Sequence, residues 1–326
     1  MLDLVLPMAD RPPPTASLLF MGTPDFAVPS LDALVEAGYR PTVVTGPDKP
    51  RGRGQRLSPT AVKRAAERHS LDVWQPASVK DRDFAARVQA LAPDLIVVVA
   101  FRILPPAVYE AARLGAFNLH ASLLPAYRGA APINRALMDG VSETGVTTFF
   151  LQRRVDTGAI LLQRAVPVGP DMTAGELHDA LSEVGADVVV DTVQRIEAGE
   201  AVGQPQDDTL ASPAPKLFKD DARIDWAQPA ETVHNHVRGL SPYPAAWTTV
   251  DGETWKLYRT RLVDDTTVAE RSGPPGVLLD TDGRLVVACG SGAVEVLEVQ
   301  RQGKRRMATG DFLHGVELQV GMRLGA

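Results

Sequence analysis

A continuous apolar run at residues 94–101 (DLIVVVAF) constrains the fold more than any other stretch of the chain. It shows no polar–apolar alternation, so the strand that it predicts must be covered on both faces. Such strands belong to parallel sheets flanked by helices. Residues 17–37 agree with this reading, because they predict a strand, a turn at residues 22–25 and a helix. The turn lacks the G-x-G-x-x-G spacing, so we predict an α/β fold without a dinucleotide site there.

The stretch 116–137 (AFNLHASLLPAYRGAAPINRAL) places polar residues where such a sheet builds its sites. It begins as a strand on which Asn118 and His120, two residues apart, point to the same face. A loop rich in Pro and Gly follows, as at the carboxyl end of a strand in an open α/β sheet. His120 can exchange protons near neutral pH, and Asn118 can donate a hydrogen bond to an oxyanion. Taken alone, an Asn-x-His pair is more often two polar loop residues that hydrogen-bond to nearby groups and have no catalytic role. The motif therefore needs further support.

Composition divides the chain into four parts. We expect residues 1–16, with three consecutive prolines, to be a disordered extension, and residues 17–203 to form the α/β domain. Residues 204–220 are rich in Gln, Pro and Asp and have the composition of a linker. From residue 221 to 326, short alternating strands separated by Gly-containing turns predict a small OB-like β-barrel.

The overall composition excludes several classes of protein. The 326 residues include one cysteine, Cys289, which rules out a disulfide framework and a multi-cysteine zinc site. No apolar run reaches the length of a membrane helix, and the first residues lack the regions of a signal peptide. We therefore expect a cytoplasmic protein with no membrane partner. The net charge of −6 argues against a general nucleic-acid binder but leaves room for local basic patches.

Two segments concentrate positive charge. Residues 46–64 carry six Lys and Arg against the single acid Asp48, and their glycines and prolines predict a mobile loop at the front of the segment. Residues 301–306 carry four more basic residues. Either segment can be an ordinary solvated surface, or it can contact the phosphates of a nucleic acid.

Five pieces of the sequence, in order along the chain, resemble the signatures of the formyltransferases that use 10-formyltetrahydrofolate. They are FMGTPDFAVPSLDAL, GPDKPRGRGQRLSPTAVK, NLHASLLPAYRGAAPI, ETGVTTFFLQRRVDTGAILLQ and KDDARIDW. The resemblance extends from about Leu18 to the C-terminus. It implies a Rossmann-like catalytic domain followed by the barrel, with 10-formyltetrahydrofolate as formyl donor and no metal. The basic loop and the second half favour the members that formylate initiator methionyl-tRNA.

The resemblance also implies roles for individual residues. Asn118, His120 and Asp156 are the expected catalytic residues, with the Asp156 carboxylate beside the imidazole, although a turn aspartate otherwise caps its own backbone. The expected folate-binding residues are Phe101, Arg102, Ile103, Ser122, Leu123, Leu124, Pro125 and Gly129. The expected tRNA-binding residues are Lys49, Arg51, Arg53, Arg56, Arg301, Lys304 and Arg305.

Two positions depart from the commoner family pattern. Lys49 stands where an arginine is often found, so the charge is kept but the bidentate fork is lost. The loop Arg102-Ile-Leu-Pro105 lacks a glycine and one further residue of that pattern, which affects the wall of the expected folate pocket.

Three other functions are compatible with these residues. The same chemistry can act on a small amine such as an amino-sugar nucleotide, or on water, which would make the protein a formyltetrahydrofolate hydrolase. A third alternative is an inactive folate- or RNA-binding module. We reject a serine hydrolase because Ser122 has no second base near it in the sequence. We expect a monomer that binds initiator methionyl-tRNA and folate.

Overall fold

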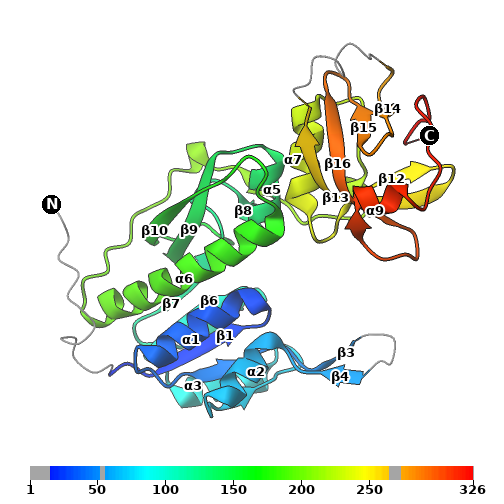
Figure 1. Cartoon of the computed structure of the whole chain (residues 1–326). Helices are drawn as coiled ribbons and strands as arrows, with labels where there is room; N and C mark the ends of the chain where they lie inside the picture. The colour runs from blue at the N-terminus through cyan, green and yellow to red at the C-terminus, as the bar shows by residue number, and fades with distance from the viewer. Residues whose placement is uncertain (1–14, 52–55, 264–272, 326) are drawn as a thin grey trace. The chain divides into compact units, whose positions relative to one another are not determined.

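A seven-stranded sheet organises the first half of the chain in the computed structural model, which describes residues 15–51, 56–263 and 273–325 (Figure 1). Its strands are β1 (Leu18–Gly22), β2 (Thr42–Val44), β5 (Val73–Trp74), β6 (Leu95–Val99), β7 (Ala116–His120), β9 (Glu143–Phe150) and β10 (Ile160–Pro167). They follow the order β10-β9-β7-β6-β1-β2-β5, and the five from β7 to β5 pair in parallel. The strand order therefore reverses between β1 and β6, and ligands bind doubly wound sheets at such a point.

Helices cover both faces of this sheet (Figure 1). They are α1 (Val28–Glu36), α2 (Ala61–Arg68), α3 (Arg82–Leu91), α4 (Pro106–Tyr109) and α6 (Ala174–Glu197), with a short 3-10 turn, η2 (Asp25–Ala27), before α1. All five residues of β6 are buried. Ile96 and Val98 pack in one cluster with Phe84 of α3, while Val97, on the opposite face, is also fully buried. The structure thus confirms the strand that the apolar run predicts.

The hairpin of β9 and β10 returns the chain to the edge of the parallel strands. β9 pairs antiparallel with β7, with Thr147 opposite His120 and Phe149 opposite Asn118. Position 158, just before β10, must be glycine because the backbone there lies close to that of Phe150. A Cβ at this position would lie 1.6 Å from the Phe150 carbonyl oxygen. The hairpin therefore brings side chains from residues 147–163 next to the end of β7.

Contacts along the chain define two compact units. The first contains Met1–Ala126, Gly145–Ala165 and Leu181–Ala211, and the second contains Tyr127–Thr144, Val166–Ala180 and Ser212–Ala326. Two segments from the middle of the chain thus belong to the second unit, an interleaving that the composition of the sequence does not indicate. The four-part division of the sequence stays a prediction.

An antiparallel half-barrel forms the core of the second unit. Its strands are β12 (Ala246–Val250), β13 (Glu253–Leu262), β14 (Leu278–Asp280), β15 (Leu285–Ala288), β16 (Ala293–Arg301) and β17 (Met307–Ala308), in the order β12-β13-β16-β15-β14 with β17 on β16. Around them lie β8 (Arg128–Gly129), α5 (Pro132–Met138), β11 (Pro213–Ala214), η4 (Asp220–Ala222), α7 (Ala230–Leu240) and α9 (Thr309–Leu313). Val237 and Leu240 of α7 pack with Trp255 in one buried cluster. This architecture confirms the predicted fold class.

The basic segment after β2 differs from the predicted loop. β3 (Lys49–Arg51) and β4 (Arg56–Ser58) form an antiparallel hairpin in which Lys49 lies opposite Ser58. The two strands pair with each other through their backbones, and the local Gly and Pro content does not reveal this pairing. The loop prediction was therefore wrong for these two strands, while residues 52–55 lie outside the described part.

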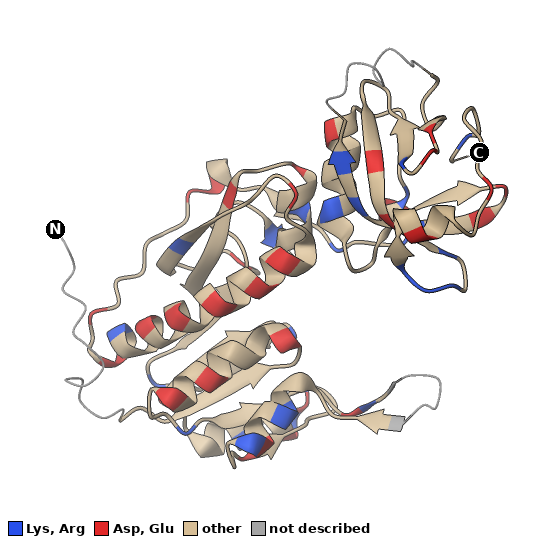
Figure 2. Ribbon diagram, viewed as in Figure 1, with Lys and Arg blue, Asp and Glu red and all other residues tan. Residues whose placement is uncertain are grey.

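Helix α6 begins at a capping box formed by Thr173 and Glu176. The Thr173 amide and hydroxyl both donate to the Glu176 carboxylate at 2.8 Å, and the Glu176 amide donates to the Thr173 hydroxyl. The 24-residue helix carries six Asp and Glu against one Arg, and Figure 2 shows these acids along its length. Within the described ranges, no helix combines the length and apolarity that crossing a membrane requires.

Glu197, at the C-terminal end of α6, binds the residues that precede β1. One oxygen of Glu197 accepts hydrogen bonds from the Thr15 amide at 2.6 Å, the Thr15 hydroxyl and the Ala16 amide, and the other accepts one from the Tyr39 hydroxyl at 2.7 Å. Burial alone raises the pKa of Glu197, but these hydrogen bonds outweigh it and hold the pKa below its usual value. The carboxylate form is therefore the one that stabilises this corner.

We expect Glu197→Gln to lower the free energy of unfolding by about 1–2 kcal/mol at pH 7, because the amide loses the charge that strengthens these bonds. Because the pKa of Glu197 is lower in the folded state than in the unfolded state, its carboxylate stabilises the fold above the unfolded-state pKa. This stabilisation is lost as the pH falls through the folded-state pKa. The difference in free energy of unfolding between wild type and variant should therefore become smaller as the pH drops below about 4. Urea unfolding at pH 7 and at acid pH measures it, with the exposed Glu200→Gln as control. An equal loss of free energy of unfolding at both pH values contradicts the stabilising role of the Glu197 carboxylate.

Candidate active site

The carboxyl end of β7 carries the predicted catalytic pair. His120 is its last residue, with 6% of its surface exposed, and Asn118 is half-buried two residues earlier. Asn118 lies between Val98 of β6 and Phe149 of β9 in the sheet register. The sequence spacing and the structure therefore agree that the two polar residues share one face of a central strand.

Asp156 joins this pair from the turn between β9 and β10. Its Oδ2 lies 4.0 Å from Nδ1 of His120, and the two side chains are 12% and 6% exposed. This separation is longer than a hydrogen bond but within the range of an ion pair with protonated histidine. The ring of Phe149 meets the imidazole edge-on, with centroids 6.5 Å apart. The structure thus brings together Asn118, His120 and Asp156, the three residues assigned to catalysis from the sequence.

The loop after His120 is held by side chains that the sequence analysis missed. The Thr147 hydroxyl donates to the Ser122 carbonyl at 2.6 Å and accepts from the Leu124 amide at 3.0 Å. The Gln163 amide donates to the Leu124 carbonyl at 2.9 Å. These two polar residues lie on the hairpin strands, where polar–apolar patterning marks them only as ordinary strand residues. They give the predicted folate loop Ser122-Leu-Leu-Pro125 a defined backbone.

Ser122 itself is fully buried, and its hydroxyl donates to the Ala126 carbonyl at 2.6 Å. A hydroxyl engaged in closing its own loop is not presented as a nucleophile. Leu123 and Pro125 are partly exposed, whereas Leu124 is buried. The loop therefore offers two apolar side chains and its backbone, rather than the Ser122 hydroxyl, to a bound molecule.

The second predicted folate segment follows β6. The Arg102 guanidinium donates to the carbonyls of Ala77 at 3.0 Å and Pro76 at 3.1 Å and lies 5.3 Å from the centroid of the Phe101 ring. These contacts give Arg102 a structural role in anchoring the loop. Ile103, in contrast, leaves 71% of its surface exposed. An exposed isoleucine beside the carboxyl ends of the strands suits contact with a flat apolar ring.

Gly129 belongs to the second unit, whereas the other predicted folate residues belong to the first. It pairs with Ala214 in the short β8–β11 ladder and has a φ of 131°. A Cβ there would lie 2.5 Å from the Ala214 carbonyl oxygen. The glycine is therefore required by backbone geometry, whatever it contacts in a ligand.

The predicted tRNA-binding residues of the first unit lie on the β3–β4 hairpin. Lys49 is exposed, Arg51 and Arg56 are paired along the backbone, and Arg53 lies outside the described residues. Asp48, the one acid of the segment, is bound to Lys63 at 2.7 Å and to Gln75, and these contacts lower the pKa of Asp48. The acid is thus neutralised by Lys63 at the base of the hairpin.

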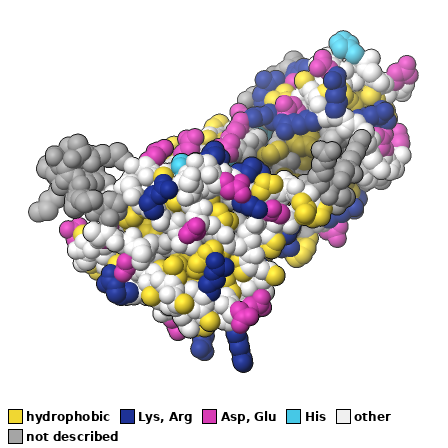
Figure 3. Space-filling model, turned by 90° about the horizontal axis from the view of Figure 1, so that it is seen from below, with side chains coloured by type: hydrophobic (Ala, Val, Ile, Leu, Met, Phe, Trp, Pro, Cys, Tyr) yellow, Lys and Arg dark blue, Asp and Glu magenta, His cyan; other side chains and the backbone are white. Residues whose placement is uncertain are grey.

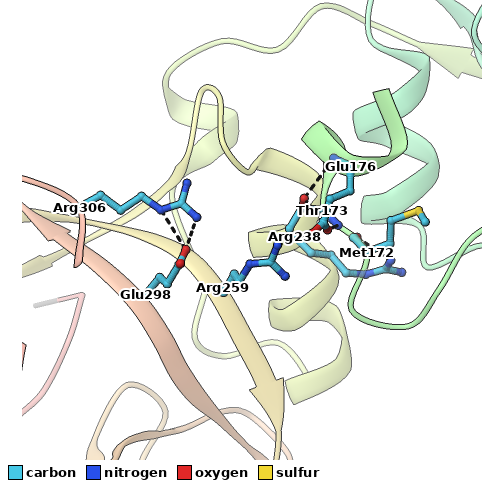
Figure 4. Close-up of polar contacts among 7 residues, drawn as sticks. All are labelled: Met172, Thr173, Glu176, Arg238, Arg259, Glu298 and Arg306. Atoms are coloured by element: carbon cyan, nitrogen blue, oxygen red, sulfur yellow. Dashed lines mark hydrogen bonds and ion pairs between the residues drawn. The ribbon is translucent and has the colours of Figure 1, made fainter. Parts of the chain in front are cut away.

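The second predicted cluster is partly neutralised by carboxylates of the half-barrel. Arg301 binds Glu253 through two nitrogens, the shortest contact being 2.6 Å, and these bonds lower the pKa of Glu253. Figure 4 shows Arg306 directed at Glu298 in the same way. Lys304 and Arg305 are exposed on the adjoining turn. Of the predicted residues in this cluster, these two are therefore better placed for phosphates than Arg301.

Charges of both signs are interspersed on the molecular face seen in Figure 3. Arg259 binds Glu176 near the capping box of α6 (Figure 4). Arg261 and Arg284 share the carboxylate of Glu295 at 2.8 and 3.0 Å.

In the described residues we find no group of three or more His, Cys, Asp or Glu arranged to hold a metal ion.

Two family models match the chain. The model described as Formyl transferase covers residues 17–193, and that described as Formyl transferase, C-terminal domain, covers residues 216–317. Among curated proteins, the methionyl-tRNA formyltransferase of Chlorobium phaeovibrioides is 50% identical over 95% of this chain and 98% of its own. That of Chlorobium luteolum is 52% identical over 93% of this chain and 98% of its own.

Solved structures share the fold at lower identity. An N-formyltransferase from Helicobacter canadensis, solved with folinic acid and dTDP-3-aminofucose, superposes with a TM-score of 0.67 at 17% identity. The match covers 88% of this chain and all of that one. At this identity the likeness concerns the fold alone.

Proposed function

Because the chain belongs to the methionyl-tRNA formyltransferase family, we propose that it transfers the formyl group of 10-formyltetrahydrofolate to the amino group of methionine on initiator methionyl-tRNA. The observation that carries the proposal is the cluster at the end of β7. Asn118 and His120 share one face of this strand, and the Asp156 carboxylate lies 4.0 Å from the imidazole. This group of residues can supply a hydrogen-bond donor, an acid and a base at one point.

In the proposed reaction, the neutral amine of methionine attacks the formyl carbon. The carbonyl oxygen becomes an oxyanion that accepts hydrogen bonds from the Asn118 amide and from His120. Asp156 accepts the proton that the amine loses, and His120 donates a proton to the folate nitrogen as its bond to carbon breaks. Transfer of the proton from Asp156 to His120 then restores both groups. The formyl carbon is reactive enough that no enzyme nucleophile is required.

The formyl donor is proposed to bind along the loops that follow β6 and β7. Ile103 is exposed, Phe101 and Leu123 are partly exposed, and the Ser122–Pro125 backbone is fixed by Thr147 and Gln163. An apolar edge beside ordered backbone polar groups is what a flat heterocycle with a hydrogen-bonding rim requires. Phe101, Ile103 and Leu123 therefore supply apolar contacts in the proposal, and the backbone carbonyl oxygens of Leu124 and Pro125 supply hydrogen-bond acceptors that orient the donor.

The acceptor tRNA is proposed to use the β3–β4 hairpin. We expect Lys49→Ala combined with Arg51→Ala to raise the KM for tRNA several-fold and to make this KM less dependent on salt concentration. Each lost phosphate contact reduces the number of counterions that tRNA releases on binding. Steady-state kinetics at two salt concentrations measure this. The exposed residues Lys80 and Arg82 supply the control, since Lys80→Ala with Arg82→Ala changes the net charge equally. A change in folate KM alone would mean that the hairpin has another role.

Transfer of labelled formyl from 10-formyltetrahydrofolate tests the proposed function. The acceptors are charged initiator methionyl-tRNA, the same tRNA uncharged, and an amino-sugar nucleotide, with folate alone as a further arm. We expect formylated product with the charged tRNA only. Free formate in every arm would indicate a hydrolase, and product with the amino sugar alone would indicate a small-amine formyltransferase.

We further propose that the protein acts as a monomer in the cytoplasm, where its acceptor takes part in translation. A molar mass near 35.0 kDa by light scattering is the expected result. A stable dimer at working concentration would contradict it.

A further inference from the structure

The turn that carries Asp156 has little burial of its own. Residues 152–155 are exposed, with Val155 at 52%, and Asp156 adopts a positive φ of 55°. Within the turn, the Thr157 hydroxyl donates to the Arg154 carbonyl, and the Gln152 amide donates to the Thr157 hydroxyl. An aspartate on so exposed a turn keeps its carboxylate in place only where further contacts fix the backbone around it.

Gln206 supplies such a contact from outside the hairpin. Its Nε2 donates to the Asp156 carbonyl at 3.1 Å and to the Gly158 carbonyl at 2.8 Å. A carboxamide nitrogen carries two N–H groups, and here both are directed at the backbone on either side of Thr157. The half-buried Gln206 thus spans the part of the turn from which the Asp156 side chain projects.

The segment that carries Gln206 is itself attached to the hairpin. Ile160 and Gln204 exchange backbone hydrogen bonds of 2.8 Å in both directions. Arg154 and Asp208 form an ion pair at 3.5 Å, and the Asp207 carboxylate caps the short turn η3 (Asp208–Leu210) by accepting from the Thr209 amide. We call residues 203–208 the strap. Its attachments on both sides of Gln206 give the carboxamide a fixed position relative to the turn.

We propose that Gln206 is a positioning residue: its carboxamide fixes the backbone of Asp156 and thereby holds the Asp156 carboxylate beside His120. The sequence assigns this residue to a linker by composition, and the function of Asn118, His120 and Asp156 does not by itself require it. The catalytic consequence, a loss of rate when Gln206 is replaced, rests on the proposed formyl transfer. The geometric consequence, a displacement of the Asp156 carboxylate from His120, does not.

The geometric consequence is tested by the NMR signal of the His120 ring at fixed pH. The six histidines are distinguished by the loss of one signal in His120→Ala. Asp156→Asn should move the His120 Cε1–H resonance, and Gln206→Met, which keeps side-chain length but donates nothing, should move it in the same direction. Gln204→Met, a matched change at an exposed residue of the strap, should leave it unmoved. Thermal unfolding checks each variant, and Gln206→Ala decides the question if Gln206→Met does not fold.

The catalytic consequence is tested by a double-mutant cycle in formyl transfer. We expect Gln206→Met to lower kcat about tenfold with folate KM unchanged, as for a small displacement of a catalytic group. The same change should have no effect in the Asp156→Asn background, because the two substitutions act on one carboxylate. A His120 resonance unmoved by Gln206→Met or by Asp156→Asn overturns the proposal, and so do additive losses of kcat. If the wild-type protein formylates nothing, the proposed function fails, and the His120 resonance still decides the role of Gln206.

Discussion

Replacing His120 by alanine is expected to lower kcat for formyl transfer by about 10²–10⁴-fold, the range for removal of a general acid–base group. The substitution removes the proton donor for the folate nitrogen and one hydrogen bond to the oxyanion. Because the side chain is 6% exposed and lies at the end of a strand that pairs with β6 on one side and β9 on the other, the loss should occur with little change in the secondary structure. Single-turnover kinetics with saturating folate and tRNA measure the chemical step directly.

His178→Ala is the matched control for this prediction. His178 lies on α6, where its ring contacts the neighbouring Asp179 and 31% of the side chain is exposed. This variant should transfer formyl at the wild-type rate. A wild-type rate in folded His120→Ala would mean that the reaction takes place elsewhere in the molecule.

Asp156→Asn is expected to lower kcat by about 10²–10³-fold while changing the KM for folate much less. Asparagine keeps the size of the side chain but cannot accept the proton of the attacking amine. Its carboxamide also lacks the charge that pairs with protonated His120 at 4.0 Å. Parallel measurement of kcat and of folate binding separates the two effects.

The control for the aspartate is Asp179→Asn, a change of the same kind at a side chain that is 80% exposed. It should have no effect on either constant. An unchanged rate in folded Asp156→Asn would remove this residue from the proton pathway, and an equal loss of rate and folate affinity would make it a binding residue instead.

Local pattern in the sequence is sufficient to predict the layers of the first half of the chain. The run at residues 94–101 predicts a strand covered on both faces, and β6 is buried along its whole length. The Thr173 and Glu176 spacing predicts the start of α6, and the reciprocal hydrogen bonds are present. These features depend on neighbours a few residues apart, so burial periodicity and capping chemistry reveal them directly.

The predictions for the basic segments show where local pattern is insufficient. Composition suggests a mobile loop at the front of residues 46–64, but β3 and β4 pair with each other. Composition also groups Arg301 with Lys304 and Arg305, yet Glu253, which lies on β13 of the same sheet, binds Arg301. Pairing and neutralisation depend on which strands become neighbours, and charge counts along the chain do not contain that information.

The sequence by itself determined the class of fold, the strand that presents Asn118 and His120, and, through resemblance, the choice of Asp156 as their partner. Only the tertiary structure decided how Asp156 reaches His120, because the β9–β10 hairpin must first pair against β7. It also decided the supporting roles of Thr147, Gln163 and Gln206, whose hydrogen bonds go to backbone groups far away in the chain. A polar residue that binds a distant carbonyl has no periodicity of its own, so its partner becomes known only when the strands have been placed.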